Sequence, residues 1–331
     1  MVLAPEWQSW VANNLVQGAA PKDVIAALEQ AEVPSDVART AVMALAASPL
    51  LSIARQHAQE SAALESVHRL RRKSRAIRGP DTTPTEREDI RPEEFLSDFY
   101  AENRPLVVRG FASDWPAVRK WSPEYFREHF GDSEVSITDG RESDPHYDRN
   151  QEQHRRTTCM RDLVQRIEST DTSNDFYMVA RDRAFWKPDM APLLDDIPTD
   201  HGLLDPEKKR QSTVLWFGPK GTLTPLHHDN TNILFVQVYG RKTIHLVAPD
   251  ETALWGMANG IYATGVDPVS PPHELQDVSF QKVELHPGDM LFLPVGWWHH
   301  VRAESVSISL AANGFPVENS FPWYHPAPRR D

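Results

Sequence analysis

The sequence predicts a mainly β protein, built as a sandwich or jelly roll of short strands and preceded by a small helical region. In the C-terminal third, short runs of β-forming residues alternate with turn residues such as Gly240 and the cluster 286–289. Most gaps between these runs are shorter than the stretch of about a dozen residues that a parallel crossover needs. The first part of the chain instead carries apolar residues at helical spacing. These patterns indicate an antiparallel β core with an added helical segment.

Composition limits the class of protein. The 331-residue chain holds 35 basic and 47 acidic side chains, for a net charge of −12, with 40% hydrophobic and 25% charged residues. These fractions are typical of a globular chain. The acidic excess argues against nucleic acid as the main partner, because phosphate binding relies on Lys and Arg. The longest apolar-leaning stretch, 41–54, is shorter than the roughly 18 apolar residues of a bilayer span, so we expect no membrane segment.

The cysteine content and the N-terminal residues of the sequence indicate a cellular compartment. The single cysteine, Cys159, excludes an internal disulfide and a zinc site built from cysteines. The segment Met1–Glu6 shows no basic stretch and no cleavage pattern, so we expect no signal peptide. Both observations favour a reducing, cytoplasmic location.

We predict two regions, a helical region over residues 1–80 and a β-rich domain over residues 81–331. The stretch 79–84 separates them, because its glycine, proline and threonine content is typical of a linker. The simplest role for the helical region is structural, either to cover a sheet edge or to build a homodimer. Recruitment of a substrate is the alternative.

Three helices are expected in the first region. One begins near Pro21, a residue that suits the first turn of a helix, and the next follows Ser35 as its N-cap. The third covers about 52–72 and is polar on most sides. It ends in a basic run from Arg69 to Arg78, which we interpret as a solvated helix end. Docking of an acidic or nucleic-acid partner is the alternative.

The rest of the chain predicts a mixed stretch followed by strands. We expect a buried strand at 104–110, a short helix at 123–131, and a loop or insertion from about 141 to 158. Further strands are expected at 213–217, 233–239, 243–247, 280–285, 290–293, 298–303 and 306–311.

Two His-x-Asp triplets are candidate metal-binding pairs, His146 with Asp148 and His227 with Asp229. His146 lies in a hydrophilic stretch without apolar neighbours to fix its orientation, so we interpret the first triplet as part of a surface loop. The second triplet precedes an apolar run that begins at Ile233. In an extended segment, residues i and i+2 face the same side, so His227 and Asp229 would present an imidazole and a carboxylate together.

A third ligand would come from the downstream pair His299 and His300, and strand alternation alone does not choose between them. Two histidines and one carboxylate form the facial triad of non-haem Fe(II) oxygenases, which leaves positions open for other ligands. The alternative for His227 and Asp229 is a hydrogen-bonded pair at the end of a strand.

Further residues suit a cavity beside such a centre. Lys242 would be costly to bury in a barrel unless it met an anion, such as the distal carboxylate of a metal-chelating acid. Thr224 could bind the same carboxylate through its hydroxyl. The alternatives are an exposed hairpin lysine and a threonine that simply precedes Pro225. Alternation over 307–313 gives one face of small or polar residues, which would line a cavity or face solvent.

Three segments carry a resemblance to a known family. They are 216–229, 235–242 and 288–300. Together they resemble the JmjC (cupin-8 type) oxygenases, a family that includes the asparaginyl hydroxylase acting on hypoxia-inducible factor and the JmjC arginyl hydroxylases. The likeness covers roughly residues 86–315.

The resemblance implies a double-stranded β-helix, or cupin core, that holds Fe(II) and uses 2-oxoglutarate and O2. The residues that match the family's metal ligands are His227, Asp229 and His299. Lys242 matches the lysine that pairs with the C5 carboxylate of 2-oxoglutarate, with Thr224 as its hydroxyl partner. Tyr177 and Asn313 resemble further residues that contact the co-substrate.

One position departs from the family pattern. Several relatives carry asparagine six residues after the first histidine, where this chain has Ile233 preceded by Asn232. Either a local shift or a different set of side chains around the metal would account for this difference.

The resemblance implies oxidation of a substrate C–H bond, most simply hydroxylation of a protein or peptide side chain, with release of succinate and CO2. A small molecule is the other option for the substrate. Two rival functions remain: a metal-binding cupin without oxygenase activity, and an RNA-modifying JmjC oxygenase. Residues 1–80 carry nine basic and seven acidic side chains, which leaves a charge near −14 on the remainder. So acidic a domain should repel a phosphate backbone, and this disfavours the RNA hypothesis.

Overall fold

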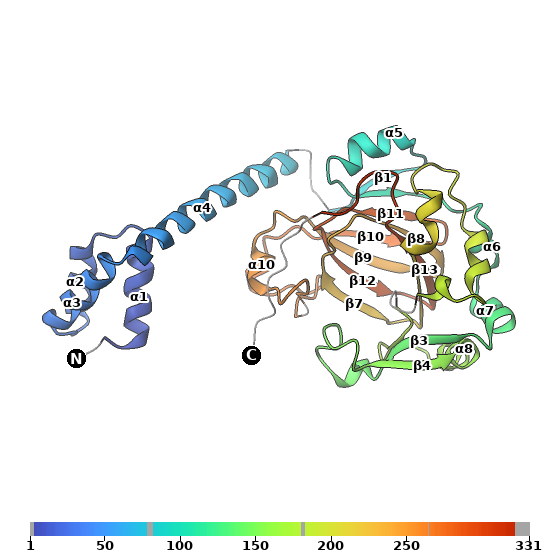
Figure 1. Cartoon of the computed structure of the whole chain (residues 1–331), viewed down its shortest axis with the longest axis horizontal. Helices are drawn as coiled ribbons and strands as arrows, with labels where there is room; N and C mark the ends of the chain where they lie inside the picture. The colour runs from blue at the N-terminus through green and yellow to red at the C-terminus, as the bar shows by residue number, and fades with distance from the viewer. Residues whose placement is uncertain (1–2, 78–81, 180–182, 264, 322–331) are drawn as a thin grey trace. The chain divides into compact units, whose positions relative to one another are not determined.

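The computed structural model describes residues 3–77, 82–179, 183–263 and 265–321 (Figure 1). The chain divides into two compact units, residues 1–77 and 78–331. Arg78 and the first part of the predicted linker, 79–81, lie outside the described residues.

The first unit is a helical bundle with its own core. Its helices are α1 (Pro5–Val16), α2 (Pro21–Gln30), α3 (Ser35–Ala46) and α4 (Pro49–Ala76). A proline starts α1, α2 and α4, where its missing N–H costs no hydrogen bond. Buried side chains from all four helices form the core, among them Val11, Leu28, Val42 and Leu51. The bundle is therefore held together by packing of apolar faces.

Three features of this unit differ from the sequence prediction, and the first is helix α1, which was not predicted. Helix α3 begins at Ser35 itself, so this residue is not the N-cap, and its hydroxyl instead donates to Glu29 Oε1 at 2.5 Å. Helix α4 is longer than predicted, because Pro49 starts it and the Ser48 hydroxyl caps it. Among the described residues, no single helix is long and apolar enough to cross a bilayer; α3 and α4 meet those criteria only as a pair bent by 66°.

The second unit is built around two β-sheets. In sheet order, the larger comprises β1 (Thr85–Arg87), β2 (Leu106–Val108), β11 (Met290–Leu293), β8 (Ile233–Tyr239), β13 (Ser307–Ala312) and β6 (Thr213–Gly218). The smaller comprises β10 (Gln281–Leu285), β9 (Lys242–Val247), β12 (Trp298–Ala303) and β7 (Leu223–His227). Neighbouring strands are antiparallel, except that β1 and β2 are parallel.

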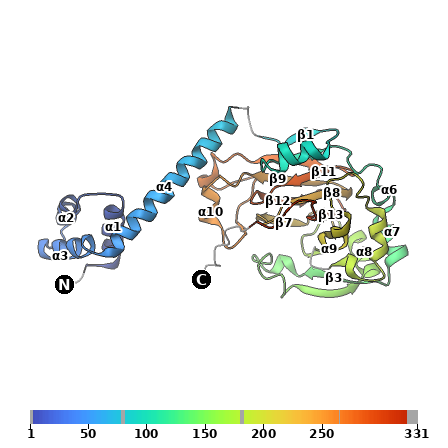
Figure 2. The same ribbon diagram turned by 45° about the horizontal axis from the view of Figure 1, so that its top comes forward.

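Apolar side chains from both sheets meet in one cluster, which includes Phe235 and Leu291 from the larger sheet and Ile244 and Val301 from the smaller. This arrangement confirms the predicted jelly-roll core. The helices of this unit are α5 (Pro92–Glu94), α6 (Pro116–Lys120), α7 (Pro123–Phe130), α8 (Met160–Glu168), α9 (Lys209–Ser212) and α10 (Ala253–Met257). Helices α6, α7 and α8 gather on the side of the sheets away from α10 (Figure 2). Their buried residues belong to the cluster that covers the outer face of the larger sheet.

A third sheet consists of β4 (Arg155–Cys159), β3 (Glu134–Asp139) and β5 (Phe176–Tyr177). Two hydrogen bonds between Met178 and Phe217, of 3.0 Å and 3.1 Å, join β5 to β6 of the larger sheet. The sequence prediction of a loop over 141–158 was wrong at the end of that range, because β4 begins at Arg155. The polar composition of β3 and β4 concealed these strands.

The turn between β8 and β9 fixes the start of the strand that carries Lys242. Gly240 has a φ of +70°, and a Cβ there would collide with the carbonyl oxygen of Val306. Glycine is therefore required at this position. Strand β9 then begins at Lys242, which pairs with Leu285 of β10 and Ala303 of β12. A central strand thus holds the lysine inside the barrel.

Candidate metal centre

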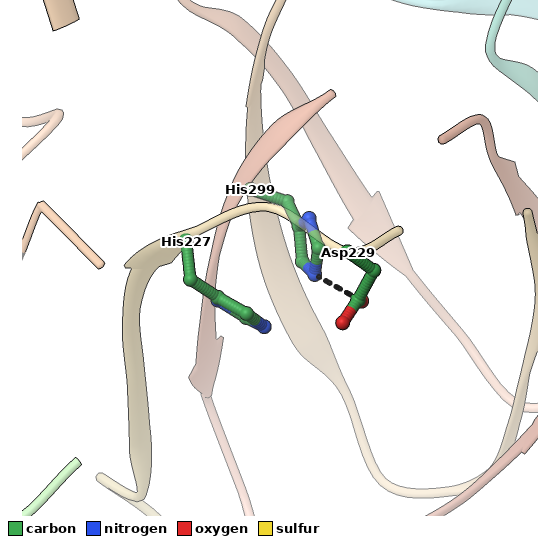
Figure 3. Close-up of side chains that lie close together, drawn as sticks. All are labelled: His227, Asp229 and His299. Carbon is green, nitrogen blue, oxygen red and sulfur yellow. Dashed lines mark ion pairs between the residues drawn. The ribbon is translucent and has the colours of Figure 1, made fainter. Parts of the chain in front are cut away.

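The three predicted metal ligands converge in the structure. His227 ends β7, Asp229 follows in the next segment, and His299 lies near the start of β12. Strands β7 and β12 are antiparallel neighbours, and their register places His299 directly opposite His227. One ligand atom from each of the three residues lies within 4.8 Å of the others, and the side chains point toward one another (Figure 3).

Strand pairing also separates the two downstream histidines. Because side chains alternate along a strand, His299 faces the same side as His227, whereas His300 faces the opposite side. There His300 pairs with His245 of β9, with ring centroids 6.0 Å apart. His228 also points away from the centre and packs against Trp298, with ring centroids 4.7 Å apart. The geometry therefore favours His299 as the third ligand.

Backbone carbonyls orient both imidazoles. The Nδ1 atoms of His227 and His299 lie 2.8 Å and 3.0 Å from the carbonyl oxygens of Pro225 and Trp297. With Nδ1–H as the donor in each case, Nε2 keeps its lone pair for a metal, as metal-binding histidines require. Burial, reinforced by the nearby His227, lowers the pKa of His299 and so favours a neutral, ligating ring.

These residues fit a divalent iron. Nε2 of His299 lies 3.5 Å from Oδ2 of Asp229, so the carboxylate and imidazole share one small space. Two neutral nitrogens and one anionic oxygen form the donor set of the facial triad. A metal held by these three ligands would keep coordination positions open for further ligands.

A cavity of about 340 Å³ adjoins the candidate centre, and all three ligand residues line it. Three predicted co-substrate residues, Lys242, Thr224 and Tyr177, line it as well. Apolar and aromatic side chains make up much of the remaining wall, as is typical of small-molecule sites. The structure thus places the candidate metal ligands and three of the four co-substrate residues around one space.

Lys242 is the most constrained polar group in this cavity. The side chain is 1% exposed, and its Nζ donates a hydrogen bond to Tyr177 Oη at 2.9 Å. Burial lowers the pKa of Lys242 to about 7, and no carboxylate among the described residues offsets this effect. A buried ammonium without a counter-ion is unfavourable. The cavity is therefore suited to an anion that reaches Lys242.

Tyr177 reaches Lys242 because β6 leaves room for its ring. A Cβ on Gly218 would lie 2.5 Å from the Tyr177 ring, so this glycine allows the close approach. Trp216, two residues earlier on the same strand, packs against the same ring with centroids 5.6 Å apart. The glycine and tryptophan together fix the tyrosine that contacts the lysine.

Asn313 is separated from the cavity, unlike the other predicted site residues. Strand β13 presents Ala311 to the cavity and ends at Ala312. The Asn313 side chain follows this strand and is exposed, while its carbonyl accepts a hydrogen bond from Asn319. The structure does not support Asn313 as a co-substrate contact.

The departure from the family pattern at Ile233 also has a structural explanation. Ile233 lines the cavity, whereas Asn232 is 1% exposed and does not line it. Asn232 Oδ1 accepts from the Val295 N–H at 2.8 Å, and the Asn319 amide donates to the Asn232 carbonyl at 2.9 Å. Asn232 therefore holds two chain segments together, and an apolar side chain stands beside the centre.

The loop 141–151 forms part of the cavity wall, which its sequence did not predict. The triplet at 146–148 was expected to lie in a surface loop; His146 is exposed, but Asp148 is 4% exposed and lines the cavity. The other lining residues from this loop are Arg141, Tyr147 and Gln151. In sequence, polar residues that line a cavity look like polar residues that face solvent. Aromatic Tyr147 within the polar run was the available signal.

Arg141 is the buried cation that this loop adds. The side chain is 4% exposed, its Nη2 donates to the Leu223 carbonyl at 2.5 Å, and its guanidinium lies 4.3 Å from the Tyr147 ring centroid. Its Nη1 is buried and has no hydrogen-bond partner in the described part of the chain. Arginine stays charged in proteins, so the cavity wall carries a permanent positive charge besides Lys242.

Comparison with known proteins bears on the family. A profile of the Cupin-like domain matches residues 92–325. Lysine-specific demethylase 8 of Xenopus tropicalis is 30% identical over 229 residues, which is 66% of this chain and 50% of that protein. Lysine-specific demethylase JMJ30 of Arabidopsis thaliana is 27% identical over 228 residues, 66% of this chain and 52% of that protein. The chain thus spans about half the length of these relatives.

A third relative carries a different activity in its name. The human bifunctional peptidase and (3S)-lysyl hydroxylase JMJD7 is 23% identical over 253 residues, which is 66% of this chain and 79% of that protein. The family match covers every strand of the β unit except β1, and every candidate site residue. From the fold, the converging ligand residues and these similarities, it follows that the chain belongs to the JmjC family of cupin-like domains, whose members use Fe(II) and 2-oxoglutarate.

Proposed function

We propose that this protein is a 2-oxoglutarate-dependent non-haem iron dioxygenase that hydroxylates a side chain of a protein or peptide. The observation that carries this proposal is one cavity that holds both the His227–Asp229–His299 cluster and the buried Lys242, which has no carboxylate partner among the described residues. A metal-binding cupin without oxygenase activity would need the cluster but not the lysine.

Each residue has a defined task in this proposal. His227, Asp229 and His299 would hold Fe(II), with the histidine tautomers set by backbone carbonyls. Lys242 binds the C5 carboxylate of 2-oxoglutarate by a charge-assisted hydrogen bond, with Tyr177 and Thr224 beside it. The apolar wall excludes bulk water from the reacting groups. With iron bound, one atom of O2 enters succinate as CO2 leaves, and the other oxidises a substrate C–H to C–OH.

The buried guanidinium of Arg141 in the cavity wall favours hydroxylation over demethylation of a lysine. A methylated lysine is a cation, and it would meet the buried guanidinium of Arg141. Burial lowers the pKa of Arg141 from its usual value, and its Nη1 has no hydrogen-bond acceptor among the described residues. A substrate with a carbonyl or carboxylate oxygen near the oxidised carbon would supply that acceptor.

The first experiment measures turnover. Purified protein with Fe(II), ascorbate and 2-oxoglutarate is expected to form succinate slowly, and faster when a substrate peptide is present. The variant His227→Ala should lose iron loading and succinate formation, while His146→Ala, from the other triplet, should keep both. Iron-loaded protein that forms no succinate under any of these conditions would contradict the proposal.

The second experiment separates the oxygenase from a metal-binding cupin. Lys242→Ala should keep iron loading but weaken binding of 2-oxoglutarate by about a hundredfold, the scale of a lost buried ion pair. Calorimetric titration of the metal-loaded protein provides the measurement. An unchanged dissociation constant would favour the metal-binding cupin.

A third experiment concerns the substrate side of the cavity. Peptide libraries should yield hydroxylated products at residues with an oxygen acceptor, and Arg141→Met should reduce the substrate-dependent part of succinate formation by about tenfold. Substrate-independent succinate formation should change little, because Arg141 is not assigned to iron or co-substrate. Preferential removal of methyl groups from lysine would contradict hydroxylation and favour a demethylase activity.

A further inference from the structure

Helix α4 exposes apolar side chains along much of its length. Only Leu51 among its 28 residues is buried, and this residue packs into the bundle core near the start of the helix. The exposed apolar residues include Leu50, Ile53, Leu64 and Val67, of which Leu64 is 61% and Val67 50% exposed. A helix of this length is not stabilised by exposed apolar groups, since helical stability comes mainly from packing.

These residues recur at the spacing of a coiled-coil seam. Steps of three and four residues along α4 give what we call the α4 stripe: Leu50, Ile53, His57, Glu60, Leu64, Val67, Arg71 and Ser74. Residues at this spacing share one face of a helix, and two such faces can pair by knobs-into-holes packing. Leu51 is the α4 residue that belongs to the bundle core, and one turn later Arg55 Nε donates to the Leu15 carbonyl at 2.9 Å. Most of the stripe thus lies beyond the bundle core.

The charges of the unit are divided between its two ends. Residues 3–48, which form the bundle, carry five acidic and two basic side chains, and all five acidic ones are exposed. The end of α4, residues 69–75, carries five basic and no acidic side chains. Two copies side by side in parallel would set basic end against basic end, whereas an antiparallel pair sets the basic end of each against the acidic bundle of the other.

We propose that the α4 stripe binds the same stripe of a second copy of this chain, in the antiparallel direction. One register brings all the large apolar residues of the stripe together. Leu50 then faces Val67 of the partner subunit, and Ile53 faces Leu64 of the partner subunit. His57 faces Glu60 of the partner subunit, which adds a polar pair at the centre. Two-fold symmetry repeats each contact and closes the assembly as a dimer.

The solution state of the full chain tests this proposal. Light scattering after size exclusion should give a dimer for the native sequence. Leu64→Glu places a carboxylate in the seam and should raise the dimer dissociation constant more than about tenfold. Ala62→Glu adds the same charge on the opposite, exposed face of α4 and should leave the dimer intact. A monomeric native chain, or a dimer indifferent to Leu64→Glu, overturns the proposal; circular dichroism establishes that the variants remain helical.

Cross-linking tests the direction. In a Cys159→Ser background, the double variant Ile53→Cys with Leu64→Cys should form an oxidised covalent dimer, because these positions face each other across the antiparallel seam. Each single variant should not, since its counterpart in the other copy lies far along the helix. Cross-linking of the single variants would show a parallel pair and refute the antiparallel arrangement.

Discussion

The Lys242 side chain shows how one residue sets the chemistry of a cavity. It is buried, yet it carries an amine whose hydrogen-bond partner is a neutral phenol, Tyr177. Burial raises the pKa of Tyr177, so the phenol stays protonated and cannot serve as counter-ion. The lysine therefore keeps its charge only at the cost of desolvation, until an anion arrives.

This balance predicts a pH dependence of co-substrate binding. With a pKa of about 7 in the free protein, Lys242 is charged below that pH and neutral above it. A carboxylate requires the charged form, so binding above pH 7 must take up a proton. The apparent dissociation constant for 2-oxoglutarate should then rise by up to about tenfold per pH unit between pH 7 and 9.

Calorimetry of the metal-loaded protein at several pH values provides the measurement. Lys242→Arg is the matched control, because arginine remains charged over this range and its binding curve should be flat. A native dissociation constant that does not change from pH 6 to 9 would contradict the assignment of Lys242 as the anchor.

For individual residues, the local sequence identified which side chains could bind a metal, but not which distant side chains lie beside them in the fold. The His-x-Asp spacing predicted that His227 and Asp229 share a side, because this depends only on strand alternation. The choice of His299 over His300 by geometry depends on the register between β7 and β12, which no local pattern encodes. Arg141 could not be predicted, since its burial results from Tyr147 and Leu223 brought together by the fold.

At the scale of elements, apolar strands were predictable and polar strands were not. The predicted bounds 233–239, 290–293 and 298–303 match β8, β11 and β12. Each of these strands has a neighbour on both sides in its sheet, and its sequence is an apolar run between turn residues. Strands β3 and β4 carry charged and hydroxyl side chains, and their pairing is stabilised by neighbours distant in sequence. The position of the loop 141–151 at the cavity also depends on contacts with residues distant in sequence, so it could not be predicted.

The contact between β5 and β6 gives a prediction for an element. In Gly218→Ala, the added methyl group would lie 2.5 Å from the Tyr177 ring and must displace it. Overpacking of this kind costs about 1–3 kcal/mol. The displaced tyrosine would also lose its hydrogen bond with Lys242, so we expect weaker 2-oxoglutarate binding by about tenfold.

Gly256→Ala in α10 is the control, because a Cβ there has nothing within 4 Å. Thermal denaturation and calorimetric titration of both variants measure stability and binding separately. Native binding by the Gly218→Ala protein would show that Tyr177 does not position the lysine.

At the scale of the whole molecule, two separate cores imply two unfolding events. The helical unit buries its apolar residues in one cluster, and the β unit buries its own in others. All candidate metal ligands belong to the β unit. A ligand that binds only the folded state stabilises the unit that contains its site.

Scanning calorimetry should therefore resolve two transitions, of which only one responds to metal. Added Mn(II), as an air-stable substitute for Fe(II), should stabilise the β unit by about 2.7 kcal/mol at a hundredfold excess over its dissociation constant. The transition of the helical unit should not move. His227→Ala should remove the shift, and a shift that persists in this variant would place the metal elsewhere.

Asn319 connects a late part of the chain to the segment that follows Asp229, one of the candidate metal ligands. Its side-chain oxygen accepts a hydrogen bond from the Asn232 N–H at 2.9 Å, and its side-chain nitrogen donates to the Asn232 carbonyl. The two residues are 87 positions apart in the sequence. The Tyr100 hydroxyl contacts the same amide. Asn319 thus fixes the backbone of the short segment between Asp229 and the start of β8. Truncation of the chain before Asn319 would keep all three candidate ligand residues and is still expected to weaken metal binding at the candidate centre.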